Sequence, residues 1–210
     1  MDASFWQQRW ERNEIAFHTA EANPLLLKHW PALGVSPGSR VFVPLCGKSL
    51  DLGWLLARGH EVAGIELSEI AVTQLFSNLK VEPQITDLGE LKRYAAKNID
   101  IYLGDLFALS SEVLGSCDAV YDRAALVALT EPMRVRYTSH LMSITGTAPQ
   151  LLISYEYDQS KLNGPPFSIT GEEVHRHYDR AYHVTLLESV PVAGGLKGHD
   201  AIEHVWLLRY

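Results

Sequence analysis

The sequence of 210 residues has little cysteine, no long apolar segment and no run of basic residues. Its two cysteines, Cys46 and Cys117, are too few for a disulfide framework and predict reduced thiols in a cytoplasmic chain. No apolar run approaches the roughly 18 residues that a membrane-spanning helix needs, so no membrane association is expected. A formal net charge of −7 without a basic stripe argues against a nucleic-acid partner.

Several catalytic and metal-binding signatures are also missing. The chain has no G-x-S-x-G turn and no phosphate-binding G-x-x-x-x-G-K-[ST] loop. His175 and His177 are two residues apart, which places them on different helix faces, and His199 and His204 have no cysteines nearby, so no metal site is predicted. The first twelve residues lack an apolar h-region, and we therefore expect no signal peptide.

The residues that are present have the composition of a globular chain, with 47% hydrophobic and 20% charged residues. A length of 210 residues suits one α/β domain with a sizeable core. No internal repeat or low-complexity segment divides the chain. We therefore expect a single domain over residues 1–210.

The segment at 40–69 has the pattern of a strand, a tight loop, a helix and a second strand. A parallel sheet binds its ligand at the carboxyl ends of such strands, beside a loop and a helix N-terminus. Glu66 follows Gly47 at about the 20-residue spacing of an acid that accepts hydrogen bonds from ribose hydroxyls. The alternative is an ordinary βαβ unit in which Glu66 merely begins the next helix.

The loop of this segment, P-L-C-G-K, contains one glycine where a dinucleotide fingerprint has three. A pyrophosphate needs close backbone approach and a helix dipole, whereas a nucleoside without phosphates needs less. The loop therefore favours S-adenosylmethionine over NAD. Cys46 within it is either a catalytic thiol or a small packing residue, and the lack of an evident histidine partner favours packing.

Periodicity and capping residues predict the other elements. Asn23 caps a helix with Pro24 at its first position, and Thr170 with Glu173 has the pattern of a capping box. Further helices are expected at 3–13, 49–58, 68–79 and 132–144, and strands at 41–43, 62–67, 99–103, 117–121, 150–157, 182–190 and 201–208, with a small hairpin in 81–97. The result is a doubly wound α/β sheet.

Charged residues follow two of the expected strands. Asp105, after the strand at 99–103, either accepts a hydrogen bond from the exocyclic amine of adenine or caps the turn that follows. Arg123, after the strand at 117–121, is a fixed bidentate donor that would bind a carboxylate or an anionic sulfur substrate, with Asp122 orienting it. The alternative for this pair is a structural ion pair at a strand end.

Aromatic residues and a proline-rich loop complete the candidate site. By pattern alone, Trp10 and Phe17 are core residues that dock an N-terminal segment. The loop N-G-P-P-F at 163–167 cannot continue a regular element and lies on the ligand side of a doubly wound sheet. We therefore expect Pro166 and Phe167 to line a substrate pocket.

Five segments resemble the thiopurine S-methyltransferase family, in order along nearly the whole chain. They are F-W-Q-Q-R-W-E-R-N-E-I-A-F-H at 5–18, P-L-C-G-K-S at 44–49, G-H-E-V-A-G-I-E-L-S-E at 59–69, D-R-A-A-L-V-A at 122–128 and Y-D-Q-S-K-L-N-G-P-P-F at 157–167. These motifs are narrower than a general methyltransferase pattern. The resemblance implies a Rossmann-like, seven-stranded class I S-adenosylmethionine-dependent methyltransferase sheet that ends in an antiparallel hairpin.

The resemblance also assigns roles. Residues 1–33 would form a helical lid over the α/β core at 40–210. Trp10 would contact the cofactor, because a sulfonium cation is attracted to the face of an indole ring, and Phe17 would contact the substrate. Leu45 and Gly47 would lie against the cofactor largely through their backbone.

The implied reaction is methyl transfer from S-adenosylmethionine to the sulfur of a small aromatic or heterocyclic thiol such as a thiopurine. Such a thiol ionises near neutral pH, so we expect no indispensable acid or base and no metal. Arg123 would favour the thiolate or anchor the cofactor's carboxylate. The expected protein is a cytoplasmic monomer that acts on a small-molecule thiol in detoxification.

Three alternatives remain open. Animal members of the family carry a basic residue in a late loop that faces substrate, whereas residues 192–198 offer only Lys197. The acceptor could therefore be a selenium or tellurium oxyanion or another thiol. A protein that only binds S-adenosyl ligands would show no turnover, and an NAD-linked reductase would need more glycines in its loop.

Arg123→Lys is expected to lower kcat/KM for methyl transfer, because lysine keeps the charge but lacks the planar bidentate fork. Steady-state kinetics with S-adenosylmethionine and a thiol acceptor measure the change. Full retention of kcat/KM would contradict both roles of Arg123.

Overall fold

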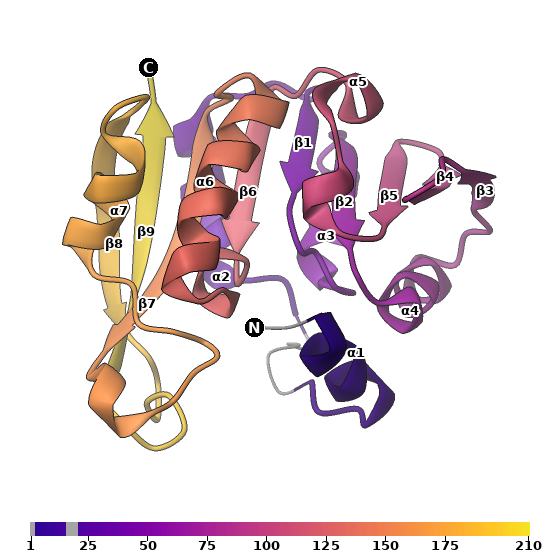
Figure 1. Cartoon of the computed structure of the whole chain (residues 1–210). Helices are drawn as coiled ribbons and strands as arrows, with labels where there is room; N and C mark the ends of the chain where they lie inside the picture. The colour runs from indigo at the N-terminus through magenta and orange to yellow at the C-terminus, as the bar shows by residue number, and fades with distance from the viewer. Residues whose placement is uncertain (1–2, 16–20) are drawn as a thin grey trace.

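The fold is built on one mixed β-sheet with helices on both of its faces (Figure 1). A computed structural model describes residues 3–15 and 21–210. The strands are β1 Arg40–Val43, β2 Glu61–Glu66, β3 Gln84–Asp87, β4 Lys92–Ala96, β5 Ile99–Leu103, β6 Ala119–Arg123, β7 Gln150–Tyr157, β8 His183–Pro191 and β9 Ala201–Arg209. In the described part of the chain these strands join in the order β3-β4-β5-β2-β1-β6-β7-β9-β8.

A helix separates most consecutive strands along the chain, but β3, β4 and β5 follow one another without a helix, as do β8 and β9. The helices are α1 Ala3–Glu11, α2 Pro24–His29, α3 Leu50–Ala57, α4 Glu69–Leu79, α5 Ser111–Leu114, α6 Glu131–Thr145 and α7 Gly171–Tyr178, with 3₁₀ turns η1 Trp30–Leu33, η2 Leu106–Ala108, η3 Leu126–Ala128 and η4 Gln159–Lys161. Within residues 3–15 and 21–210, no helix combines the length and the apolar character needed to cross a membrane.

The sheet has more strands than the seven expected. Strands β5, β2, β1, β6 and β7 are parallel, and β9 runs antiparallel between β7 and β8. These seven strands are the ones that the sequence predicts. The predicted hairpin at 81–97 forms β3 and β4 and joins the same sheet, because β4 pairs antiparallel with the edge of β5. The expected count was therefore wrong by two. Backbone pairing holds this hairpin, and its largely polar sequence did not indicate that pairing.

Two apolar layers form because alternate residues of a buried strand face opposite sides of the sheet. Phe42 packs with the layer that contains Tyr137 of α6. Its neighbours Val41 and Val43 pack with the layer that contains Leu52 of α3. The short apolar runs predicted as buried strands are explained by this burial on both faces.

The helix starts are largely those that the sequence predicts. The side chain of Asn23 accepts the N–H of Leu25 at 2.7 Å, with Pro24 at the first helical position. The capping box at α7 forms only in part: Thr170 Oγ1 accepts the N–H of Glu173 at 3.2 Å, but the Glu173 carboxylate binds Arg134 instead of the Thr170 backbone. A tertiary ion pair has replaced the second half of the local motif.

Strand β6 begins and ends two residues later than predicted. It spans Ala119–Arg123, in register with β1 through the pair Val41 and Ala119. Asp118 lies before the strand, where its carboxylate accepts the N–H of Arg40 at 2.7 Å. Arg123 is therefore the last residue of the strand and not the second residue after it.

Asp122 is a fully buried acid on β6. Tyr137 donates its hydroxyl to Asp122 Oδ2 at 2.6 Å, and the N–H of Leu126 donates to Oδ1 at 3.3 Å. Burial raises the pKa of Asp122 to about 6, although these hydrogen bonds oppose the shift. These partners show that Asp122 joins β6 to α6 and to η3.

Asp122→Asn is expected to change the pH dependence of stability. The pKa of this acid is raised from 3.8 to about 6 on folding, so the wild-type chain loses stability as the pH rises through that window. Asparagine does not titrate, so the variant does not have this loss of stability in the pH window. The unfolding free energy of the variant should therefore rise relative to wild type across the window, by up to ~3 kcal/mol. Urea unfolding at several pH values measures it, and parallel profiles would contradict the prediction.

Candidate active site

A pocket with a volume of about 410 Å³ opens at the carboxyl ends of β1, β2 and β6. Its walls also include residues of α1, of η3, of β7 and of the loops that follow β7 and β8. In Figure 1, α1 lies next to the carboxyl ends of the central strands. This edge of a parallel sheet is where open α/β folds bind ligands, and the volume suits a small molecule.

Glu66 is the last residue of β2 and is 7% exposed. Its Oε2 accepts the N–H of Gly47 at 2.9 Å, and its Oε1 accepts the N–H of Ser68 at 2.8 Å. Burial raises the pKa of Glu66, although these hydrogen bonds oppose the shift. A carboxylate has about four acceptor positions, so each oxygen retains capacity for a ligand hydroxyl.

The loop after β1 carries backbone strain beside the pocket. Leu45 has φ 46° and Gly47 has φ 54°. Cys46 between them is buried. Burial raises the pKa of its thiol well above the ordinary value, and the negative charge of the nearby Glu66 adds a smaller increase. A thiol held neutral in this way is a packing residue, in agreement with the interpretation that the sequence favours.

Trp10 of α1 lies across this loop. The ring is so close to Gly47 that an added Cβ there would meet Trp10 Cζ2 at 3.3 Å. Lys48 Nζ lies 5.9 Å from the centroid of the Trp10 ring. Trp6 and Arg9, on the same helix, also line the pocket. The N-terminal helix thus supplies an aromatic wall opposite the strand ends.

Arg123 has a carboxylate partner that the sequence analysis did not name. Its Nη1 lies 3.6 Å from Asp51 Oδ2, and Asp51 also accepts the hydroxyl of Tyr121 at 2.9 Å and the N–H of Asn23 at 2.7 Å. Burial opposes the charge of Arg123, but Tyr121 and Asp51 hold its pKa above the ordinary value. The expected orienting role of Asp122 is replaced by Asp51, because the carboxylate of Asp122 is directed to Tyr137 and η3.

Another wall of the pocket is formed by η3, by the loop that follows β7 and by the loop between β8 and β9. Val127 and Pro166 supply apolar surface, and Tyr155 of β7 is also part of the lining. Lys197 Nζ donates to the carbonyl of Pro165 at 3.1 Å, which joins the β8–β9 loop to the loop after β7.

The charged residues of the lining are mostly cations. Among residues 3–15 and 21–210, the lining contains the cations Arg9, Arg123 and Lys197 and one acid, Glu66. Three lining residues other than glycine, Leu45, Ala124 and Lys197, have φ of 46°, 68° and 50°. Left-handed backbone of this kind gathers at functional sites, where surrounding structure holds it in place.

The structure brings together most of the residues that the sequence singled out. Those that line the pocket are Trp10, Leu45, Gly47, Glu66, Arg123 and Pro166. Their roles toward a ligand stay predictions. Asp105 and Phe167 lie outside the lining. The Asp105 carboxylate accepts the N–H of Phe107 at 3.0 Å and so caps η2. The centroid of the Phe167 ring lies 5.9 Å from the Arg134 guanidinium. Phe17 lies outside the described residues.

Sequence reasoning missed Trp6, Arg9 and Tyr155 as lining residues. Trp6 and Trp10 are one helical turn apart, a spacing that places both on one face and could have indicated Trp6. Tyr155 lies within β7, beyond the end of its parallel neighbour β6, and only the register of the strands reveals this position. Nothing near Asp51 in the sequence signals its link to Arg123.

Two solved methyltransferases illustrate the similarity of fold. The 1,6-didemethyltoxoflavin-N1-methyltransferase of Burkholderia thailandensis, with bound S-adenosylhomocysteine, aligns with a TM-score of 0.68 at 16% identity, over 99% of this chain and 87% of that one. The magnesium protoporphyrin IX methyltransferase of Synechocystis gives a TM-score of 0.66 at 14% identity, over 100% of both chains. The sheet order and the pocket at the strand ends define the fold class of the S-adenosylmethionine-dependent methyltransferases.

Sequence comparison then identifies the family. The family described as thiopurine S-methyltransferase matches residues 1–207. A thiopurine S-methyltransferase of Xanthobacter autotrophicus is 53% identical over 211 residues, which cover 100% of this chain and 99% of that protein. The chain belongs to the thiopurine S-methyltransferase family.

Glu66→Ala is expected to weaken S-adenosylhomocysteine binding by ~2–3 kcal/mol, because a charged acceptor is removed and the Gly47 and Ser68 N–H groups lose their partner. Isothermal titration measures the dissociation constant. Glu69→Ala is the matched control, since Glu69 lies three residues away, outside the lining, and bonds Tyr94 instead. An unchanged dissociation constant for Glu66→Ala would remove Glu66 from the binding site.

Proposed function

We propose that this chain transfers the methyl group of S-adenosylmethionine to the sulfur of a small aromatic or heterocyclic thiol, such as a thiopurine. The observation that carries the proposal is the meeting of Glu66, Trp10 and Arg123 in one pocket. These side chains supply an acceptor for ribose hydroxyls, an aromatic face for a sulfonium and a fixed cation for an anion. The activity in the name of the relative from X. autotrophicus supports the same reaction.

The residues of the pocket fit this cosubstrate. Glu66 would hold the ribose, and Leu45 and Gly47 would lie along the nucleoside through their backbone. Trp10 would face the sulfonium from α1. When bound, S-adenosylmethionine supplies a methyl group on a positively charged sulfur. The S-adenosylhomocysteine bound in the B. thailandensis enzyme supports a ligand of this type in the same fold.

The chain itself contributes mainly position and electrostatics. Arg123 would lower the pKa of a bound thiol and so favour the reactive thiolate. Burial raises the pKa of Tyr155 to about 12, and the nearby Glu203 adds to the shift, so the hydroxyl of this lining residue stays protonated and uncharged. Holding the reacting atoms at near-attack distance contributes ~7–11 kcal/mol in comparable systems, so the proposal includes no indispensable acid or base.

The remaining expectations complete the proposal. Residues 1–33 act as a lid on the core at 40–210, within one domain over residues 1–210. The protein works as a monomer in the cytoplasm, without a metal and without nucleic-acid or membrane partners. Two unpaired cysteines support a reducing compartment. Cationic residues in the lining, Arg9 and Lys197, make a selenium or tellurium oxyanion the second candidate acceptor.

The test is methyl transfer from labelled S-adenosylmethionine to mercaptopurine, with the product identified by mass. We expect an S-methylated purine. Hypoxanthine, which carries oxygen in place of the sulfur, is the control and should yield no product. Selenite in a parallel reaction tests the second acceptor. Binding of S-adenosylhomocysteine without turnover of either acceptor would contradict the proposal and indicate a protein that only binds S-adenosyl ligands.

A further inference from the structure

Two segments form the apolar wall of the pocket on the side of α6. The first is η3, which contributes Val127 and Ala128, and the second is the loop that contributes Pro165 and Pro166. A backbone hydrogen bond of 2.6 Å from the N–H of Phe167 to the carbonyl of Val127 joins the two segments. Any displacement of one segment would therefore be transmitted to the other.

Arg134 of α6 contacts both segments from behind the wall. Its Nη1 donates to the carbonyl of Leu129, the C-cap residue directly after η3, at 2.7 Å. Its guanidinium lies 5.9 Å from the centroid of the Phe167 ring, at the end of the second segment. Arg134 is not among the lining residues, so it acts on the pocket only through these contacts.

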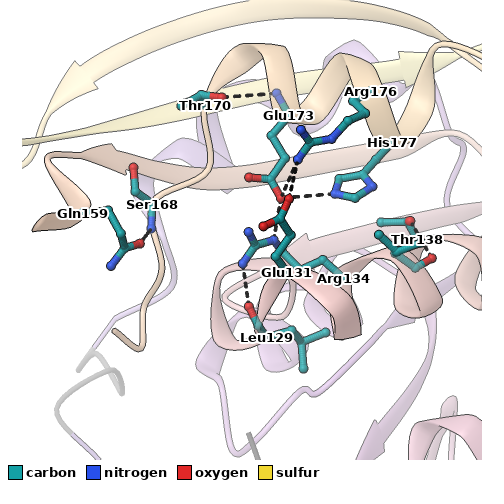
Figure 2. A network of polar contacts seen from close by, with 11 residues as sticks. Leu129, Glu131, Arg134, Thr138, Gln159, Ser168, Thr170, Glu173, Arg176 and His177 are labelled. Carbon is teal, nitrogen blue, oxygen red and sulfur yellow. Dashed lines mark hydrogen bonds and ion pairs between the residues drawn. The ribbon is translucent and has the colours of Figure 1, made fainter. Parts of the chain in front are cut away.

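Helix α7 holds Arg134 in this orientation, as Figure 2 shows. Arg134 Nε donates to Glu173 Oε1 at 2.6 Å, and His177 Nε2 lies 3.2 Å from the same oxygen. Arg134 and Glu173 are 6% and 8% exposed. Burial favours a higher pKa for Glu173, but the hydrogen bonds from His177 and Arg134 outweigh it and lower the pKa, so the acid stays charged.

We infer that Arg134 is a positioning residue that sets the acceptor wall of the pocket, and through it the choice of acceptor. The inference rests on the proposed function, and it takes the acceptor to lie against the apolar wall that includes Val127 and Pro166. Glu173 and His177 orient the arginine, and the arginine in turn orients the wall. The nucleoside end of the pocket, around Glu66, has no contact with this network in the described structure.

Only arginine can make all of these contacts. Its planar fork donates in two directions and presents a flat face to an aromatic ring, whereas lysine is a point charge on a flexible stem. Arg134→Lys therefore keeps the charge that Glu173 requires but cannot hold Leu129 and Phe167 at the same time. The wall should then relax while the buried carboxylate remains neutralised.

The experiment compares Arg134→Lys with wild type in full-length protein. KM for mercaptopurine should rise about tenfold, since small displacements in a positioning site have effects of this size or larger. The dissociation constant of S-adenosylhomocysteine should stay within about twofold, and KM for thiophenol, a smaller thiol, should rise less. Arg176→Lys is the matched control, because Arg176 is the exposed member of the same network and should behave as wild type (Figure 2).

Phe167→Leu provides a second route if Arg134→Lys does not fold. It removes the ring that Arg134 faces and leaves the ion pair with Glu173 intact, and the same selective rise in KM for mercaptopurine is expected. The inference would be overturned if both variants kept the wild-type KM values for mercaptopurine and thiophenol. It would also be overturned if KM for both thiols and the dissociation constant of S-adenosylhomocysteine rose by the same factor. Failure of the proposed function is distinct, because wild type would then form no methylated thiol at all.

Discussion

The pocket depends on a carboxylate buried at the end of β2. By accepting the N–H groups of Gly47 and Ser68, Glu66 holds the loop after β1 against the start of α4. A buried charge without such partners is strongly unfavourable, so the acid and the two loops stabilise one another. The glycine in the first loop also lets the ring of Trp10 approach the backbone, since a Cβ at that position would crowd the indole. One carboxylate therefore arranges the binding edge, and α1 completes it.

Other buried carboxylates support the remaining walls in the same manner. Asp51 gathers donors from Asn23, Tyr121 and Arg123 and so connects the segment before α2 with β6. Glu173 gathers Arg134 and His177 and connects α7 with α6. In both groups, nearby donors offset the charge of the buried carboxylate. The lining itself keeps an excess of cations, which suits an acceptor that reacts as an anion.

The sequence predicted the central elements well because their signals are local. Buried parallel strands are apolar on both faces, so β5 and β7 were placed with their observed bounds, and the cap at Asn23 formed as expected. Predictions that needed a partner elsewhere in the chain were less accurate. The hairpin at 81–97 was expected, but its pairing with the edge of β5 was not, because a polar strand held by backbone hydrogen bonds leaves little trace in the side-chain pattern.

By itself, the sequence determined the alternation of strands and helices and the loop-and-acid pattern from Gly47 to Glu66, since periodicity, turn residues and spacing act over short distances. The five motifs likewise pointed to the family that the comparisons identify. Only the tertiary structure decided that Asp51 pairs with Arg123, that Glu173 pairs with Arg134, and which residues of α1 and β7 reach the pocket. The physical reason is that a side chain finds its partner through strand order and register, which bring together residues that are far apart in the chain.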